Sequence, residues 1–449
     1  MSILISRVLI GTLIISGYIF ASCEEAPAPV FEPPGPIFAD PGDDGVFADS
    51  AWRTALHRYD GIADGITPQP LQGGELIAFV HNGLTANVLY HVDAETGVVV
   101  DSFPIEHPDL GFGSLTEYAG DGLRIGDDYV AKLRSRPFRF SLRDGTVSWR
   151  LTEVYSLGSV LDGKLYAGRS TSRDQPPMLA VIDLESGSVI DSIGSPEWHR
   201  IENSKGGFDA IRAFRRPADG SVTVATTLTY INSDSSAAGN IDVRLGYDLA
   251  TKRELWRHRE PGLRNFSLHP PVYAGGLIVQ AGTHEICGYD PATGEEVWRY
   301  DPWYLPYPSL EEAGVHPPTD QVVASNGSFN SAPFVNPATG YVYFASLNYY
   351  QFCLDPATGQ EVWRGGGRGA PGSTFAPIGA GMLSSASTGG TLHRVVDMAT
   401  GELLTQLERY AGSGAFTTAL YYDAERNLLV GFDGAHALAW RPRFEIPGG

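Results

Sequence analysis

The residues that could do chemistry are few and widely separated. The chain has only three cysteines, Cys23, Cys287 and Cys353, and its 11 histidines lack the spacing of a metal site. The motifs G-x-S-x-G and C-x-x-C do not occur. "GRGAPG" (367–372) matches the glycine pattern of dinucleotide-binding folds, but it contains a proline and belongs to no strand–helix–strand unit. No nucleophile, phosphate loop or metal site therefore stands out.

Two further segments match ligand-binding motifs only in part. "ADPGDDGVFADS" (39–50) has the acidic residues and glycine of a calcium loop, but Ala51 stands where the bidentate glutamate belongs. "HEICG" (284–288) lacks the second histidine of a zinc-protease helix and lies in a strand-like stretch. A pair of carboxylates from distant segments remains open, because sequence does not show distances across a fold.

The first 22 residues have the features of an export signal. Arg7 precedes an apolar stretch, residues 8–20, that is short for a membrane span, and "FASC" leads into Cys23. This arrangement resembles the bacterial lipobox, in which the cysteine is lipidated, although Phe20 stands where leucine is usual. The alternative is an ordinary secretory signal cleaved nearby. Residues 23–48 are rich in proline and acidic side chains and are expected to form an extended tether.

Composition and the lipobox resemblance bear on location. Glu24 follows Cys23, in place of the aspartate that retains many lipoproteins at the inner membrane. The resemblance therefore implies export and lipid anchoring to the outer membrane of a Gram-negative-type bacterium, on its periplasmic or outer side. A net charge of −20 argues against binding to nucleic acid. Only four of the 32 basic residues are lysines, which suits either a high-salt habitat or a GC-rich genome.

The rest of the chain is repetitive. An aspartate before an ATG-like turn recurs, with one degenerate copy at a serine, at Asp93, Ser141, Asp183, Asp248, Asp290, Asp355 and Asp397. Successive separations are 48, 42, 65, 42, 65 and 42 residues, which indicates a unit of 42 with about 23 residues inserted twice. Each unit contains short β-rich runs broken by turn residues, with no helical periodicity. Four antiparallel strands per unit are typical of a propeller blade.

A tryptophan recurs in the fourth strand of these units. Trp149, Trp256, Trp298 and Trp363 each lie four residues after the last residue of the turn. A large ring repeated at one position indicates packing between blades. "GYDPATGEEVW" and "CLDPATGQEVW" resemble the tryptophan-docking repeat of the pyrroloquinoline-quinone (PQQ) propeller superfamily. The resemblance covers residues 75–440 and implies that each tryptophan packs on the turn of the neighbouring blade.

Eight units can be counted, and the last lacks a fourth strand. "DSAWRTALHRYDG" (49–61) resembles that missing strand, with Trp52 in the position of the blade tryptophan. The sequence therefore predicts an all-β, eight-bladed propeller of four-stranded antiparallel blades, closed by an N-terminal strand. The expected domains are a signal peptide over 1–22, a tether over 23–48 and a propeller over 49–445. A monomer is expected.

The superfamily includes soluble quinoprotein dehydrogenases and BamB-type outer-membrane lipoproteins. Resemblance to the dehydrogenases implies an adjacent pair of cysteines beside the quinone and a Glu, Asn and Asp set for calcium. No two cysteines are adjacent here, so neither PQQ nor any other cofactor is expected, and no catalytic residue is assigned. Cys287 and Cys353 lie three and two residues before their motif aspartates, so they are expected to be buried on opposite faces of their sheets.

Two insertions follow fourth strands, at 194–207 and 301–330. The second brings together Trp303, Tyr304 and Tyr307, which are candidate anchors for a protein partner; alternatively they plug the tunnel mouth. One hypothesis is a non-catalytic, surface-tethered scaffold similar to BamB-type lipoproteins, with outer-membrane barrel-assembly components as partners. The other is a periplasmic or extracellular enzyme, a divergent quinoprotein dehydrogenase or a hydrolase, that uses the tunnel. The missing cysteine pair favours the scaffold.

Overall fold

The computed structural model describes the strands of the chain and most of their tight turns. The described residues are 49–56, 66, 68–71, 76–82, 87–105, 115–116, 124–133, 136–153, 155–169, 178–194, 204–217, 219–232, 241–259, 271–281, 285–300, 333–345, 350–366, 374–378, 381–385, 392–401, 403–408, 420–432 and 436–442. Cys23, Trp303, Tyr304, Tyr307 and the predicted signal and tether lie outside them. All described residues belong to one compact unit, 36–449. Within them, no helix is long and apolar enough to cross a membrane.

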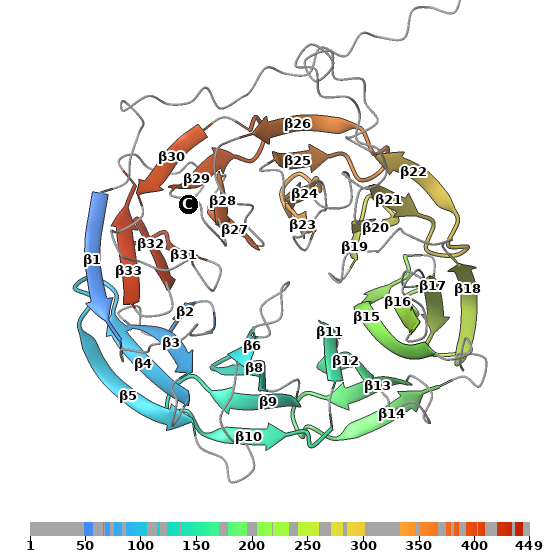
Figure 1. The fold of residues 1–449 in the computed structure, drawn as a ribbon, viewed down its shortest axis with the longest axis horizontal. Coiled ribbons are helices and arrows are strands. Elements are labelled where there is room, and N and C mark those ends of the chain that lie inside the picture. The colour runs from blue at the N-terminus through green and yellow to red at the C-terminus, as the bar shows by residue number, and fades with distance from the viewer. Residues whose placement is uncertain are drawn as a thin grey trace, which may run out of the picture. The chain divides into compact units, whose positions relative to one another are not determined.

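The described strands form eight antiparallel sheets around a ring, with the first strand of each innermost and the fourth outermost (Figure 1). We number these blades in chain order. Blade 1 contains β2 (Gln69–Pro70), β3 (Leu76–Asn82), β4 (Asn87–Asp93) and β5 (Val99–Ile105). Blade 2 contains β6 (Leu115–Thr116), β7 (Arg124–Ile125), β8 (Asp128–Leu133), β9 (Arg136–Ser141) and β10 (Val147–Arg150). Blade 3 contains β11 (Tyr155–Leu161), β12 (Lys164–Arg169), β13 (Met178–Asp183) and β14 (Val189–Ile193). Blade 4 contains β15 (Ser204–Arg215), β16 (Val222–Asn232), β17 (Ile241–Asp248) and β18 (Arg253–Arg259).

The second half of the ring repeats this plan. Blade 5 contains β19 (Val272–Ala274), β20 (Leu277–Ala281), β21 (Ile286–Tyr289) and β22 (Glu296–Tyr300). Blade 6 contains β23 (Phe334–Val335), β24 (Val342–Ala345), β25 (Tyr350–Leu354) and β26 (Glu361–Gly366). Blade 7 contains β27 (Thr374–Ile378), β28 (Gly381–Ser385), β29 (Leu392–Asp397) and β30 (Leu403–Glu408). Blade 8 contains β31 (Tyr421–Asp423), β32 (Leu428–Phe432), β33 (His436–Arg441) and β1 (Asp49–Ala55).

The closing strand is β1, which pairs antiparallel with β33 from the far end of the chain. The predicted eight-bladed ring and its N-terminal closure are therefore confirmed. Blade 2 departs from the predicted four strands, because its inner strand is split into β6 and β7, which both pair with β8. The sequence between them, "EYAGDGL", contains two glycines.

The recurring aspartate shapes the turn between the third and fourth strands. Its Oδ1 accepts the backbone N–H of the residue three positions later, at 2.8 Å in Asp93 and 2.9 Å in Asp290. The fourth strand begins three positions after that residue in both blades, so one short side chain shapes the hairpin. In blade 5 the turn ends at Gly294, whose φ of +71° suits glycine.

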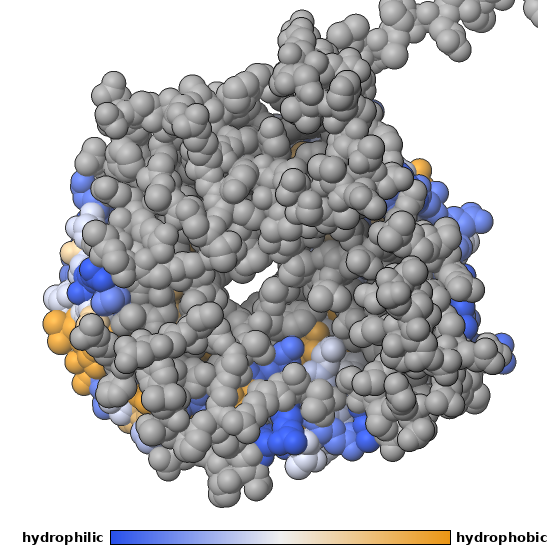
Figure 2. Space-filling model, in the orientation of Figure 1, coloured by the Kyte–Doolittle hydropathy of each residue, from blue (hydrophilic) through white to orange (hydrophobic). Residues whose placement is uncertain are grey.

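Every outer strand among the described blades carries a β-bulge at the same place. The pairing register skips the residue directly before the tryptophan position, namely Ala51, Val100, Ser148, Ile190, Leu255, Val297, Val362 and Leu404. The bulge turns this residue outward, which explains why Val100 is 57% exposed although it lies in a strand. Apolar side chains accordingly reach the surface of the rim, most visibly at the lower left of Figure 2, where Figure 1 places β1 and β5. A bulge also discourages edge-to-edge pairing of these outer strands.

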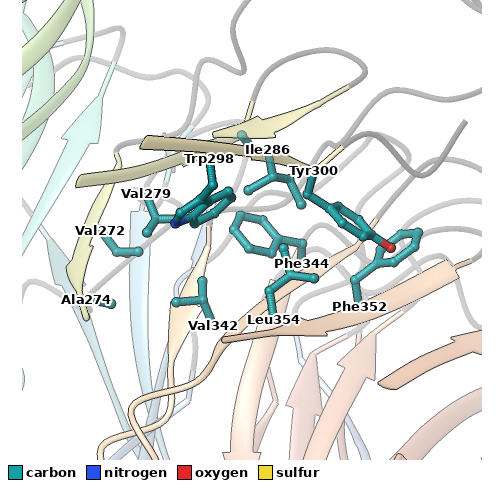
Figure 3. Close-up of a cluster of buried hydrophobic side chains, with 11 residues drawn as sticks. Val272, Ala274, Val279, Ile286, Trp298, Tyr300, Val342, Phe344, Phe352 and Leu354 are labelled. Atoms are coloured by element: carbon teal, nitrogen blue, oxygen red, sulfur yellow. The ribbon is translucent and has the colours of Figure 1, made fainter. Parts of the chain in front are cut away.

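The core lies between blades rather than within one. The cluster between blades 5 and 6 joins Val279, Ile286 and Trp298 to Val342 and Phe344 (Figure 3). Both faces of each such sheet are buried against a neighbour, so a blade is stable only as part of the ring.

Candidate functional site

Contacts between successive blades hold the ring together. We call each of them a joint and name it by its two blades, so that joint 5/6 lies between blades 5 and 6. In five joints a fourth-strand tryptophan lies against the turn of the next blade, and its Nε1 donates to the carbonyl oxygen of the residue after the motif aspartate or its equivalent. The donor–acceptor pairs are Trp52–Ala94 (2.9 Å), Trp149–Leu184 (2.8 Å), Trp256–Pro291 (3.1 Å), Trp298–Pro356 (2.9 Å) and Trp363–Met398 (2.9 Å). These five are the tryptophans that the sequence singled out, and the indoles are 4–9% exposed.

The indole needs glycine on the facing turn. A Cβ on Gly359 would lie 2.5 Å from Cδ2 of Trp298, and the φ of Gly359 is +72°. The same ring is also covered from its own blade, where a Cβ on Gly288 would lie 2.3 Å from its Cε2. Trp298 is therefore held between two glycines. Gly288 and its counterpart Gly246 were not predicted from the sequence, although the repeated "GYD" before the turn contains both.

Joint 1/2 lacks the indole and replaces its hydrogen bond. Asp101 pairs with His91 at the tryptophan position of β5. The ring nitrogen Nε2 of His91 lies 2.8 Å from the carbonyl oxygen of Leu142, which is the carbonyl that an indole would reach. His91 is buried and packs edge-on against Phe103, with ring centroids 5.1 Å apart.

Joint 7/8 lacks the indole for a different reason. Thr405 stands at the tryptophan position of β30, paired with Val395. Blade 8 offers it no Asp-x-x-x-Gly turn, because the third and fourth strands of that blade, β33 and β1, come from distant parts of the chain. The tryptophan is thus missing where its docking turn is missing.

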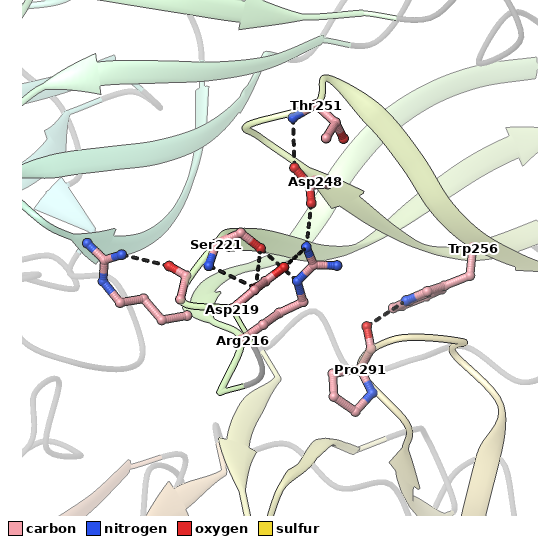
Figure 4. A network of polar contacts seen from close by, with 9 residues as sticks. Arg216, Asp219, Ser221, Asp248, Thr251, Trp256 and Pro291 are labelled. Atoms are coloured by element: carbon pink, nitrogen blue, oxygen red, sulfur yellow. Dashed lines mark hydrogen bonds and ion pairs between the residues drawn. The ribbon is translucent and has the colours of Figure 1, made fainter.

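Joint 3/4 has an ion pair in place of the tryptophan and the glycine on which it packs. Asp191 takes the tryptophan position, Lys252 takes the glycine position, and Lys252 Nζ lies 3.0 Å from Asp191 Oδ1. The Lys252 turn is fixed within blade 4 by Arg216, which binds Asp248 at 2.6 Å and Asp219 at 2.9 Å (Figure 4). Figure 4 also shows the Trp256–Pro291 contact of the next joint.

Ionisable groups also cross the tryptophan joints. Arg139 donates to the Leu184 carbonyl oxygen in blade 3 and forms an ion pair with Glu185, both at 2.8 Å. In joint 5/6 the hydroxyl of Tyr300 donates to Glu361. Burial raises the pKa of Glu361, and this hydrogen bond from Tyr300 partly offsets the effect. These contacts link neighbouring blades.

The two cysteines of the ring are buried free thiols in different joints. Cys287 packs with Trp256 and Ile278 in joint 4/5, whereas Cys353 packs with Trp363 in joint 6/7. The expectation that they lie buried on opposite faces of their sheets is confirmed. Burial raises the pKa of Cys353 to about 12, which leaves the thiol protonated and unreactive.

The remaining predicted site residues, Cys23, Trp303, Tyr304 and Tyr307, lie outside the described residues, so their placement stays a prediction. Within the described ranges, no group of three or more His, Cys, Asp or Glu side chains could hold a metal ion. The predicted residues that the structure does bring together are the blade tryptophans and the turns on which they pack.

Comparison with known families bears on the repeats. The family model described as "Outer membrane protein assembly factor BamB" matches residues 139–343, from β9 in blade 2 to β24 in blade 6. The chain is a β-propeller with PQQ-like repeats. The superfamily resemblance that its tryptophan repeats suggested is thereby confirmed. No curated protein sequence matches the chain.

Solved structures similar to this propeller differ widely in kind. The computationally designed Ika8 protein is 13% identical, with 88% of this chain and 99% of that chain covered and a TM-score of 0.54. Quinohemoprotein alcohol dehydrogenase from Comamonas testosteroni is 12% identical, with 88% and 76% covered and a TM-score of 0.56. Saccharomyces cerevisiae Sqt1 is 12% identical, with 89% and 100% covered and a TM-score of 0.55. At this identity the similarity shows the fold alone.

Proposed function

We propose that this propeller is a non-catalytic scaffold, exported and tethered to the outer membrane through Cys23, that binds protein partners. The observation that carries the proposal is the match of residues 139–343 to a family described as an outer membrane protein assembly factor. The lipobox-like segment that ends at Cys23 supports the same location. By analogy with that family, the partners are components that assemble outer-membrane barrels.

The ring residues do not fit the quinone site that the dehydrogenase resemblance implies. That site needs two adjacent cysteines beside the cofactor. Here Cys287 and Cys353 lie in different joints, each packed against a tryptophan. We therefore propose that the propeller works without PQQ.

The proposed partner surface is the insertion 301–330. It begins directly after β22, whose last residue, Tyr300, is fixed by its hydrogen bond to Glu361 in blade 6 and by an edge-on contact with Phe352 (Figure 3). Trp303, Tyr304 and Tyr307 follow within seven residues of this rigid joint. Tryptophan and tyrosine are enriched among the residues that contribute most to binding at protein interfaces, which suits these three as anchors.

The test is recovery of partners from detergent-solubilised membranes of the native host, with the tagged full chain as bait. Replacing Trp303, Tyr304 and Tyr307 together by alanine is expected to abolish recovery of barrel-assembly components and to leave the melting temperature nearly unchanged. The matched control replaces Val98, Val99 and Val100, three exposed apolar residues on the rim of blade 1, by alanine and should retain recovery.

Two outcomes would contradict the proposal. Normal recovery by the aromatic triple variant would remove the binding surface from 301–330. A large drop in its melting temperature would assign the three aromatics to packing of the tunnel mouth instead. Reduction of an electron-accepting dye by the wild-type protein, given PQQ, calcium and an alcohol, would establish the alternative, a divergent quinoprotein enzyme.

A further inference from the structure

Joint 3/4 is built from exposed charges where five other joints have a buried indole. Lys252 is 61% exposed in its side chain and Asp191 is 33% exposed, so water reaches both. Lysine is scarce in this chain, at four of 449 residues, and Lys252 adopts a φ of +54° at a position that elsewhere holds glycine. A lysine at this position costs backbone strain, which glycine would avoid.

A second exposed ion pair crosses the same joint. Arg215 of β15 lies 2.5 Å from Asp162, in the tight turn that joins β11 and β12. The side chains of Arg215 and Asp162 are 54% and 41% exposed. Both the outer fourth-strand contact and this hairpin contact of joint 3/4 are therefore ionic.

The inner part of the joint is different. Tyr166 and Leu179 of blade 3 pack with Ile211, Val224 and Leu245 of blade 4 in a buried apolar cluster, which also includes Ile193 at the end of β14. The backbone N–H of Ala213 also donates to the buried Oγ of Ser159, at 2.6 Å, across the joint. Apolar packing thus holds the interior of the joint, and a buried hydrogen bond ties the innermost strands β11 and β15; neither depends on ionic strength.

We propose that joint 3/4 is a salt-controlled joint, whose outer part opens more often as ionic strength rises while β11 and β15 act as the hinge. The interaction of exposed charges weakens with salt, because the Debye length falls from about 10 Å at 0.1 M to about 3 Å at 1 M. Burial of an indole does not weaken in this way, and excluded salts strengthen apolar contacts. Salt therefore loosens the outer edge of joint 3/4 relative to the Trp–Gly contacts of the tryptophan joints.

Hydrogen exchange of the full chain, compared at about 0.1 M and about 1 M sodium chloride, tests the proposal. The exposed Lys252–Asp191 pair, at ordinary strength, predicts that amides of β14 and of the turn 248–252 exchange about twofold faster at high salt. The internal control is joint 4/5, where amides of β18 and of the turn 290–294 lie at the Trp256–Gly294 contact and are expected not to accelerate. Rates are referred to an unstructured peptide in each buffer.

Three variants separate the ion pair from the general effect of salt on an acidic protein. Asp191→Asn removes the charge and keeps the shape, so β14 should exchange at the high-salt rate in both buffers. Asp191→Lys with Lys252→Asp restores the pair in reverse and should restore the salt response. Asp191→Trp with Lys252→Gly installs the apolar pair and should abolish the response.

The proposal is overturned if wild-type β14 exchanges equally fast at both salt concentrations. It is also overturned if Asp191→Asn keeps the full salt response, because the effect would then arise from overall charge. Since Asp191→Asn is isosteric, this comparison holds even where a double variant fails to fold.

Discussion

Gly359 offers a direct test of tryptophan docking, because the same blade supplies a matched control. Alanine at Gly359 meets two penalties: a φ of +72° and a Cβ placed 2.5 Å from the Trp298 ring. The first costs about 1 kcal/mol and the second about 1–3 kcal/mol. Gly340, in the other hairpin of blade 6, has a φ of +76° with no atom within 4 Å of its Cβ. Gly340→Ala should therefore cost only about 1 kcal/mol.

The assay is equilibrium unfolding of both variants, alone and combined with Trp298→Ala. If roughly 400 residues unfold together, each kcal/mol lowers the melting temperature by about 1 °C. Trp298→Ala alone should cost about 3–5 kcal/mol, and it removes the ring that the new Cβ would strike. Gly359→Ala should then add only about 1 kcal/mol in the Trp298→Ala background. Equal effects of Gly359→Ala and Gly340→Ala, or full additivity with Trp298→Ala, would refute the docking account.

Three further predictions follow from burial and from the sequence. Burial raises the folded-state pKa of Glu361, so the stability that this group contributes below pH 4 is lost as pH rises through that pKa. Glu361→Gln carries no charge and still accepts the hydrogen bond from Tyr300. The variant should therefore have a higher melting temperature than the wild type at pH 7 and the same one near pH 3. An unchanged pH profile would show that Glu361 ionises freely. Cys287 and Cys353 should resist maleimide until the protein unfolds, as mass spectrometry can record, because burial raises both thiol pKa values. Modification of the native protein would contradict this. Cys23→Ala should release the chain from membranes at its precursor mass, whereas unchanged membrane association would place the anchor elsewhere.

The fold could be predicted from the sequence because each repeat contains local signals for its own strands and turns. A period of 42 residues, a turn aspartate and a tryptophan four residues after the turn are local signals that recur in several units. Trp52 could be recognised far from the other copies for the same reason, and its pairing position in β1 follows from ring closure. The outer bulge could not be read in this way, since a residue skipped in pairing looks like any other strand residue.

The exceptional joints could not be predicted, because each depends on a pair of residues that meet only in the folded ring. Asp191 and Lys252 are 61 residues apart, and neither one alone indicates an ion pair in place of an indole. His91 and Leu142 are 51 residues apart, and the missing tryptophan at Asp101 gave no hint that a histidine would reach the same carbonyl. Such replacements of the tryptophan contact can be recognised only in the folded ring, where it is known which residues of neighbouring blades meet.

A shifted pKa between two propeller blades has a different meaning from a shifted pKa in a cleft. A raised pKa often marks a catalytic residue, yet burial alone produces one. Burial raises the pKa of Tyr155 and of Tyr166 to about 12, and both side chains lie in clusters shared by two blades. Cys353 and Glu361 likewise line joints. Because these shifts arise from packing between blades, a raised pKa in this ring does not by itself identify a catalytic residue.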